Sequence, residues 1–184
     1  MTAKSNDDVK ELSRSNIKNA PPTSLFQDIL SLLIKIFIIL TALVLIFTFL
    51  FGIFIVKDMT MKPAVQDGDI AIFYRLSGNY AVDDIVAVEY EKEKQLRRII
   101  AVSGDTVDIT EEGLFINGSF IVEKNTQEIL LYEEGITFPV TVPANHIFVL
   151  ADIRSGSADS RIYGTVPLDD VFGKVTTLVS SRNF

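Results

Sequence analysis

The stretch VKDMTMKPAV, residues 56–65, decides how this chain is organised, because it begins where a long apolar segment ends. That segment, Ile36–Val56, has 21 residues and no charge. A helix needs roughly 20 apolar residues to cross a bilayer core. Lys35 and Lys57 bracket the segment, and their long stems can carry the charges to the interface. The sequence therefore predicts a membrane anchor helix at 25–56, spanning about 36–56, after a polar tail at 1–24 that we expect to be disordered.

A cleaved signal peptide is the alternative interpretation of this segment. Its apolar region would be shorter, and small residues would mark a cleavage site. Here Lys-Asp-Met-Thr follows Val56, so an uncleaved anchor is favoured. Charge does not decide the orientation, because basic residues flank both ends: Lys18 and Lys35 before the span, and Lys57, Lys62 and Arg75 after it.

The chain after the anchor has the pattern of a mainly antiparallel β domain. Short runs of β-branched and aromatic residues alternate with turn residues, which is typical of strands. Asn117-Gly118 is the dipeptide best suited to a tight type I′ hairpin. Thr137–Val142 is a weaker candidate, because Pro139 confines it to a sheet edge or a bulge. The other expected strands are 70–74, 85–90, 114–116, 119–122, 147–150 and 171–179.

Composition excludes several classes of function. The chain has no cysteine and a single histidine, His146, so the sequence predicts no disulfide, no thiol nucleophile, no metal site and no cofactor. Its net charge is −7, and an acidic domain is a poor partner for phosphate backbones. We therefore expect no nucleic-acid binding.

Two further stretches, LRRIIAVSGD at 96–105 and ADIRSGSADSR at 151–161, complete a set with residues 56–65. Together they resemble the three signature boxes of the type I signal peptidases, from the membrane segment to the C-terminus. The resemblance implies a β domain of signal-peptidase (LexA-like) type at 57–184. It also implies a single-pass protein of the cell membrane, with a cytoplasmic N-terminus and an extracellular C-terminal domain.

The resemblance fails at the residues that would do the chemistry. In the family, a serine before Met-x-Pro is the nucleophile, and a lysine before an Arg-hydrophobic run is the base. Here Thr60 occupies the nucleophile position and Arg97 the base position. A threonine hydroxyl needs a base to become a nucleophile, and arginine stays protonated in proteins. Asp58 lies in the oxyanion region, where its charge would repel the developing oxyanion; a pair with Arg97 is a hypothesis from the motif positions.

The third box departs less from the family pattern. Ala151 and Ile153 replace an expected glycine and asparagine. Ser157 remains, in the place of the usual partner of the base. We expect the retained box to support the fold, because buried hydrogen-bond networks can outlive catalysis. The matching residues are Asp152, Arg154, Ser157, Asp159, Ser160, Arg161 and Gly164.

Other residues offer no base at the family position. Lys62 lies two residues after Thr60, so both can face one side of an extended segment. Lys57 is placed at the membrane interface. His146 follows Pro143-Ala144-Asn145, and an exposed or turn-packed histidine is the expectation there.

Two functions from different classes follow. As a degenerate family member without the serine–lysine dyad, the chain resembles the signal-peptidase-like pilus assembly proteins of streptococci, which occur beside sortases in Gram-positive bacteria. That resemblance implies a non-catalytic assembly factor or chaperone for secreted surface proteins such as pilins. Its partners would be a secreted precursor or pilin subunit, a sortase and the lipid bilayer. The alternative is an active type I signal peptidase with Thr60 as an atypical nucleophile. A third possibility, an autoproteolytic repressor relative, is disfavoured by the anchor.

Overall fold

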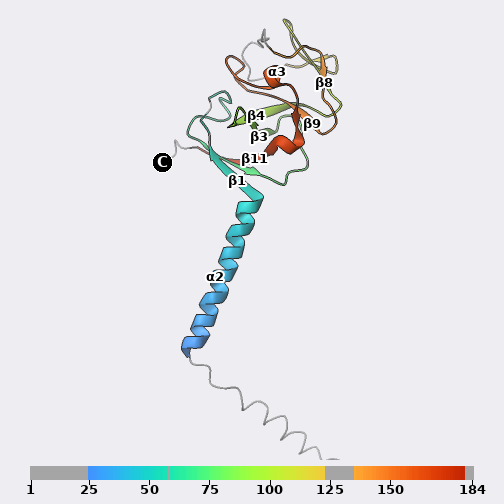
Figure 1. Cartoon of the computed structure of the whole chain (residues 1–184). Coiled ribbons are helices and arrows are strands. Elements are labelled where there is room, and N and C mark those ends of the chain that lie inside the picture. Colours follow the sequence, from blue (N-terminus) through green and yellow to red (C-terminus); the bar gives the residue numbers. More distant parts are fainter. Residues whose placement is uncertain (1–24, 58, 123–134, 181–184) are drawn as a thin grey trace, which may run out of the picture. The chain divides into compact units, whose positions relative to one another are not determined.

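The structure is a computed structural model that describes residues 25–57, 59–122 and 135–180 (Figure 1). These residues divide into two compact units between Leu45 and Ile46. Helix α2, Leu25–Leu50, makes up the described part of the first unit and leads into the second. The strands all belong to the second unit.

From Ile36 onward helix α2 carries no charged residue and is apolar on all sides, and none of its side chains is buried. A helix satisfies its own backbone hydrogen bonds, which is what allows a single segment to cross a bilayer. In the part of the chain that the structure describes, α2 is the one helix long and apolar enough to cross a membrane. Its composition therefore indicates a membrane anchor, in line with the sequence.

The predicted C-terminal end of the anchor helix, at residue 56, is wrong. The helix ends at Leu50, and Phe51–Ile55 forms strand β1. Strand β1 pairs antiparallel with β2, Ile70–Tyr74. Apolar Ile and Phe residues suit a strand as well as a helix, and hydropathy alone does not separate the two. Gly52, a poor helix residue, lies against the ring of Phe73 and allows the two strands to approach.

The larger described sheet of the second unit has seven strands, and its neighbouring strands pair antiparallel. Its strand order is β1-β2-β11-β3-β4-β9-β10. Most of these strands agree with the sequence prediction. The bounds of the remaining members are β3 Ile85–Tyr90, β4 Glu93–Val102, β9 His146–Leu150, β10 Val166–Pro167 and β11 Val171–Val179.

A smaller sheet has the order β7-β6-β5-β8. Asn117 and Gly118 join β6 to β7 with positive φ angles of 52° and 77°, as a type I′ turn requires, so the predicted hairpin is confirmed. Pro139 precedes β8 at the edge of this sheet, which agrees with its predicted edge position. The bounds are β5 Thr106–Thr110, β6 Gly113–Ile116, β7 Ser119–Phe120 and β8 Val140–Thr141.

Two buried clusters fix the parts that matter for the site. One places Met61 and Val65 against Phe73, Leu96 and Ala151, so the stretch that follows the anchor is held by its own apolar residues. Another packs β5 and β6 of the small sheet onto β9. The remaining elements are the short helix α3, Ser160–Tyr163, and the 3-10 helix η1, Leu168–Asp170.

Candidate functional site

Thr60 lies on a tight turn whose neighbours anchor it. Met61 and Val65 are fully buried, and the Val65 amide donates to the Met61 carbonyl at 2.9 Å. The Thr60 carbonyl accepts a hydrogen bond from the Ile153 amide at 2.6 Å. The first and third boxes are therefore tied together by backbone at the position of the expected nucleophile.

Arg97 reaches the same place from strand β4. Its side chain is only 1% exposed. Its Nη1 donates to Thr60 Oγ1 at 3.1 Å, its Nε to the Ala158 carbonyl at 2.8 Å, and its Nη2 to Gln95 Oε1 at 2.7 Å. The second box thus meets both other boxes through a single guanidinium.

An open cleft of about 300 Å³ lies beside this contact. Residues from all three boxes line it, together with the start of β4. Among the described lining residues, the cationic side chains of Lys57, Lys94 and Arg97 outnumber the single carboxylate, that of Glu93. The lining residues are Lys57, Thr60, Glu93, Lys94, Gln95, Arg97, Gly156, Ser157 and Ala158.

The geometry joins a hydroxyl to a group that can only donate. A guanidinium carries five N–H donors and no lone pair. Thr60 Oγ1 accepts from Arg97, so Arg97 cannot take the Thr60 proton in the way a neutral lysine would. The contact orients the threonine hydroxyl without supplying a general base.

Behind the cleft, the third box forms a buried ionic network. Asp159 is fully buried and accepts from Arg161 Nε and Nη2, both at 2.8 Å. Its carboxylate also accepts from the Ala151 amide at 3.2 Å and caps helix α3 through the Arg161 amide at 3.1 Å. These four hydrogen bonds compensate for the burial of the two opposite charges.

Ser157 and Arg154 extend this network. Ser157 Oγ accepts from Arg161 Nη2 at 3.1 Å and lies within 3.1 Å of the Arg154 carbonyl. Arg154 Nε donates to the Ala151 carbonyl at 2.6 Å. The structure therefore brings together the box residues that the sequence singled out, and their contacts hold the 151–161 loop in one shape.

Asp152 belongs to a separate pair that the sequence did not reveal. Arg98 donates two hydrogen bonds of 2.8 Å each to the Asp152 carboxylate, from Nε and Nη2. Arg98 Nη1 also donates to the Asp83 carbonyl at 3.0 Å. The two neighbouring arginines of β4 thus point to different sides of the sheet, as the alternation of a strand requires. This alternation could have predicted that Arg97 and Arg98 face opposite sides. The strand at 93–102 was not predicted from the sequence, so the signal was not used.

Two more residues beside Arg97 were missed. Gln95 accepts from its Nη2, and Tyr163 lies close to it. Burial raises the pKa of Tyr163 well above the usual tyrosine range, and Arg97 offsets part of the rise. The Tyr163 ring packs on that of Tyr90, with centroids 4.9 Å apart. Strand alternation places Gln95 on the same face of β4 as Arg97, so the strand assignment would have found it, whereas only the tertiary structure places Tyr163.

The remaining candidates differ in outcome. Asp58 lies outside the described residues, so its pairing with Arg97 stays a prediction. Lys62 Nζ contacts Met59 Sδ at 3.3 Å, and Lys62 does not line the cleft. His146 is the first residue of β9, and its Nδ1 lies 2.9 Å from the carbonyl of Ala144 in the preceding turn. His146 does not line the cleft either. Lys57 does line it.

Comparison with known proteins gives a consistent assignment. The family model described as "Signal peptidase, peptidase S26" matches residues 29–180. Signal peptidase I P of Bacillus subtilis subsp. natto is 33% identical over 138 residues, which cover 67% of this chain and 75% of that protein. Signal peptidase I of Bacillus licheniformis is 31% identical over 163 residues, covering 82% and 83%. A crystal structure of a signal peptidase I from Enterococcus faecalis is 30% identical, covers 53% of this chain and 97% of that one, and has a TM-score of 0.44.

The family match covers most of the chain, including all three boxes, and the relatives are matched over two thirds or more of their length. The chain therefore belongs to the signal peptidase family, peptidase S26.

Proposed function

We propose that this chain is a membrane-anchored, signal-peptidase-like protein that binds a secreted precursor without cleaving it. In this role it acts as an assembly factor or chaperone for secreted surface proteins such as pilins. Its partners are a precursor or pilin subunit, a sortase and the bilayer that holds helix α2. The N-terminal tail lies in the cytoplasm and the β domain outside the cell.

The observation that carries the proposal is the hydrogen bond from Arg97 Nη1 to Thr60 Oγ1. A hydroxyl nucleophile has to give its proton to a group with a lone pair, and a guanidinium has none. Arg97 is also held by the Ala158 carbonyl and by Gln95, so the surrounding chain keeps it in this donor role. General-base help is worth roughly 10²- to 10⁴-fold in rate, and Arg97 does not provide it.

The open volume of the cleft supports a binding role. About 300 Å³ remains open beside Thr60 and Arg97, enough to admit a side chain of a bound segment. The third-box network holds the 156–158 wall of this cleft in place through Ser157 and Asp159. A groove of this kind can hold a precursor segment even though the dyad is lost.

The test measures cleavage and binding together. The purified full-length protein in lipid–detergent micelles is given a fluorescently labelled preprotein with a small-x-small cleavage site, beside Thr60→Ala and Thr177→Ala. Thr177 is an exposed threonine outside the cleft, so Thr177→Ala removes the same group elsewhere. We expect all three proteins to bind the preprotein and none to release a product. Cleavage by the native protein and Thr177→Ala, but not by Thr60→Ala, would show that the proposal is wrong.

The second candidate function is an active signal peptidase with Thr60 as nucleophile. Its support is the naming of the relatives as signal peptidase I and the presence of Lys57 in the same cleft as Thr60. Lys57, rather than Lys62, is the lysine that this structure offers as a base. If the native protein cleaves, Lys57→Met should abolish cleavage while Lys62→Met leaves it within about twofold of native, since Lys62 contacts Met59 instead.

A further inference from the structure

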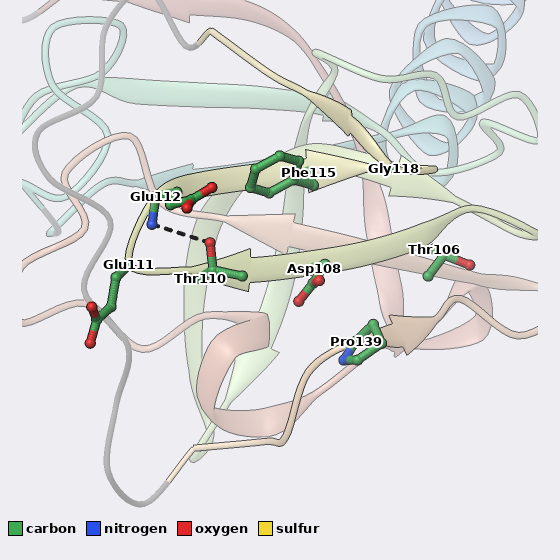
Figure 2. Close-up of a pocket in the computed structure, with 8 residues that line it drawn as sticks. All are labelled: Thr106, Asp108, Thr110, Glu111, Glu112, Phe115, Gly118 and Pro139. Atoms are coloured by element: carbon green, nitrogen blue, oxygen red, sulfur yellow. Dashed lines mark hydrogen bonds between the residues drawn. The ribbon is translucent and has the colours of Figure 1, made fainter.

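A second groove lies on the small sheet and includes none of the residues of the three boxes. It encloses about 660 Å³ and is lined from β5, from β6 and from the turn between them (Figure 2). Val107 and Ile109 of β5 are buried in the core, so the alternate residues of this strand face the groove. We call it the small-sheet groove and define it by Thr106, Asp108, Thr110, Glu111, Glu112 and Phe115.

The small-sheet groove is acidic. Figure 2 shows Asp108 on β5, and Glu111 and Glu112 at the end of the β5–β6 hairpin. Among the described residues that line the groove, none is a lysine or an arginine. Within the ranges 25–57, 59–122 and 135–180, none of these three carboxylates forms an ion pair or a side-chain hydrogen bond. Among the described residues, no cationic side chain therefore neutralises their charge.

An aromatic surface borders these carboxylates. Phe115 lies directly across from Asp108 in the strand register and packs edge-on against Phe120, with ring centroids 5.4 Å apart. Phe120 remains 54% exposed. Its ring covers Gly113, where a Cβ would come within 2.6 Å of the Phe120 ring. The exposed Phe120 ring thus packs on Gly113 and on the Phe115 ring. The two rings form an aromatic surface beside the carboxylates.

Carboxylates and aromatic faces together attract ammonium and guanidinium groups. A bound metal ion fits less well, because the described residues contain no set of three carboxylate or imidazole ligands with metal-site geometry. The volume also exceeds what one ion needs and suits several side chains. We propose that the small-sheet groove binds a short lysine- or arginine-bearing segment of a partner protein, with a basic side chain over Phe115 and its charge among Asp108, Glu111 and Glu112.

Binding is tested with the full-length protein in micelles and a fluorescein-labelled heptapeptide of alternating lysine and serine. The same peptide with glutamate in place of lysine is the ligand control. We expect saturable one-to-one binding of the lysine peptide that weakens as salt rises, because exposed charges are screened. The triple variant Asp108→Asn/Glu111→Gln/Glu112→Gln should raise Kd about tenfold, as three lost exposed pairs would. The matched triple Glu91→Gln/Asp169→Asn/Asp170→Asn removes the same charge outside the groove and should change Kd less than about twofold.

The site is located by protection, which the absence of native cysteine makes possible. Thr110→Cys places a thiol in the small-sheet groove, and Gly78→Cys places one in open space elsewhere. The lysine peptide should slow maleimide labelling of the first thiol and not of the second. Failure of the native protein to bind saturably, equal losses in both charge triples, or no protection of Cys at position 110 would each overturn the proposal. The peptide should bind Thr60→Ala as it binds the native protein, so this outcome is separate from that of the proposed function.

Discussion

The contact between Thr60 and Arg97 joins the residues at the nucleophile and base positions. The two residues are 37 positions apart in the chain, and the guanidinium donates to the hydroxyl at 3.1 Å. Each replacement keeps part of what the family residue offers. Threonine keeps an oxygen, and arginine keeps a positive charge, but the lone pair that a base needs is lost.

Placing a serine at position 60 and a lysine at position 97 should allow cleavage of a preprotein if the cleft is otherwise intact. We expect Thr60→Ser/Arg97→Lys to cleave a labelled preprotein at least about 10²-fold faster than the native protein, because a lysine can accept the serine proton once it is desolvated. Release of the mature fragment in lipid–detergent micelles is the measurement.

Thr60→Ser alone is the control, since it keeps Arg97 and should remain as inactive as the native protein. A double variant that binds the preprotein but gains no activity would show that another residue of the site, and not the dyad alone, blocks the reaction.

At the scale of elements, the 151–161 loop works as a unit because its charges are buried together. Asp159 and Arg161 have fully buried side chains in the pair that joins them. Asp159→Asn leaves the Arg161 charge uncompensated, so we expect the free energy of unfolding to fall by about 3 to 5 kcal/mol. Urea unfolding of the full-length protein, followed by circular dichroism, measures it. Asp169→Asn, at an exposed carboxylate, should change the same quantity by less than about 0.5 kcal/mol; equal effects of both changes would contradict the buried-pair account.

Strand β1 depends on a glycine at the place where the chain leaves helix α2. A Cβ at Gly52 would lie 2.1 Å from Cζ of the buried Phe73 ring. Gly52→Ala should therefore lower the free energy of unfolding by about 1 to 3 kcal/mol through overpacking.

The comparison variant is Gly78→Ala, where the added Cβ meets nothing within 4 Å. Adding Phe73→Leu to Gly52→Ala should recover part of the loss by making room for the methyl. If Gly52→Ala unfolds at the same urea concentration as the native protein, the close approach of β1 to Phe73 does not limit stability.

At the scale of the whole molecule, the chain combines an apolar helix with a β unit, so the side of the membrane on which each end lies can be tested. We expect the tail on the cytoplasmic side and the β unit outside. A membrane-impermeant maleimide added to intact cells should label Gly78→Cys at once. It should label Ser13→Cys in the N-terminal tail only after the cells are permeabilised. The native chain has no cysteine and provides the blank; the reverse labelling pattern would invert the topology.

The sequence by itself determined the class of the protein. An uncharged run of 21 residues predicted a membrane helix, and β-branched runs with Asn117-Gly118 predicted strands and a hairpin. These features depend on neighbours in the sequence, so local pattern is enough to find them. The three boxes predicted the family and the positions Thr60 and Arg97, because order and spacing survive when single residues change.

Only the tertiary structure decided where helix α2 stops and what surrounds Arg97. Residues 51–55 are apolar enough for either element, and pairing with β2 selects the strand. Strand alternation sends Arg97 to Thr60 and Arg98 to Asp152, and these contacts, like the approach of Tyr163 to Arg97, join residues far apart in the chain. Long-range packing sets such contacts, and no local pattern in the sequence records it.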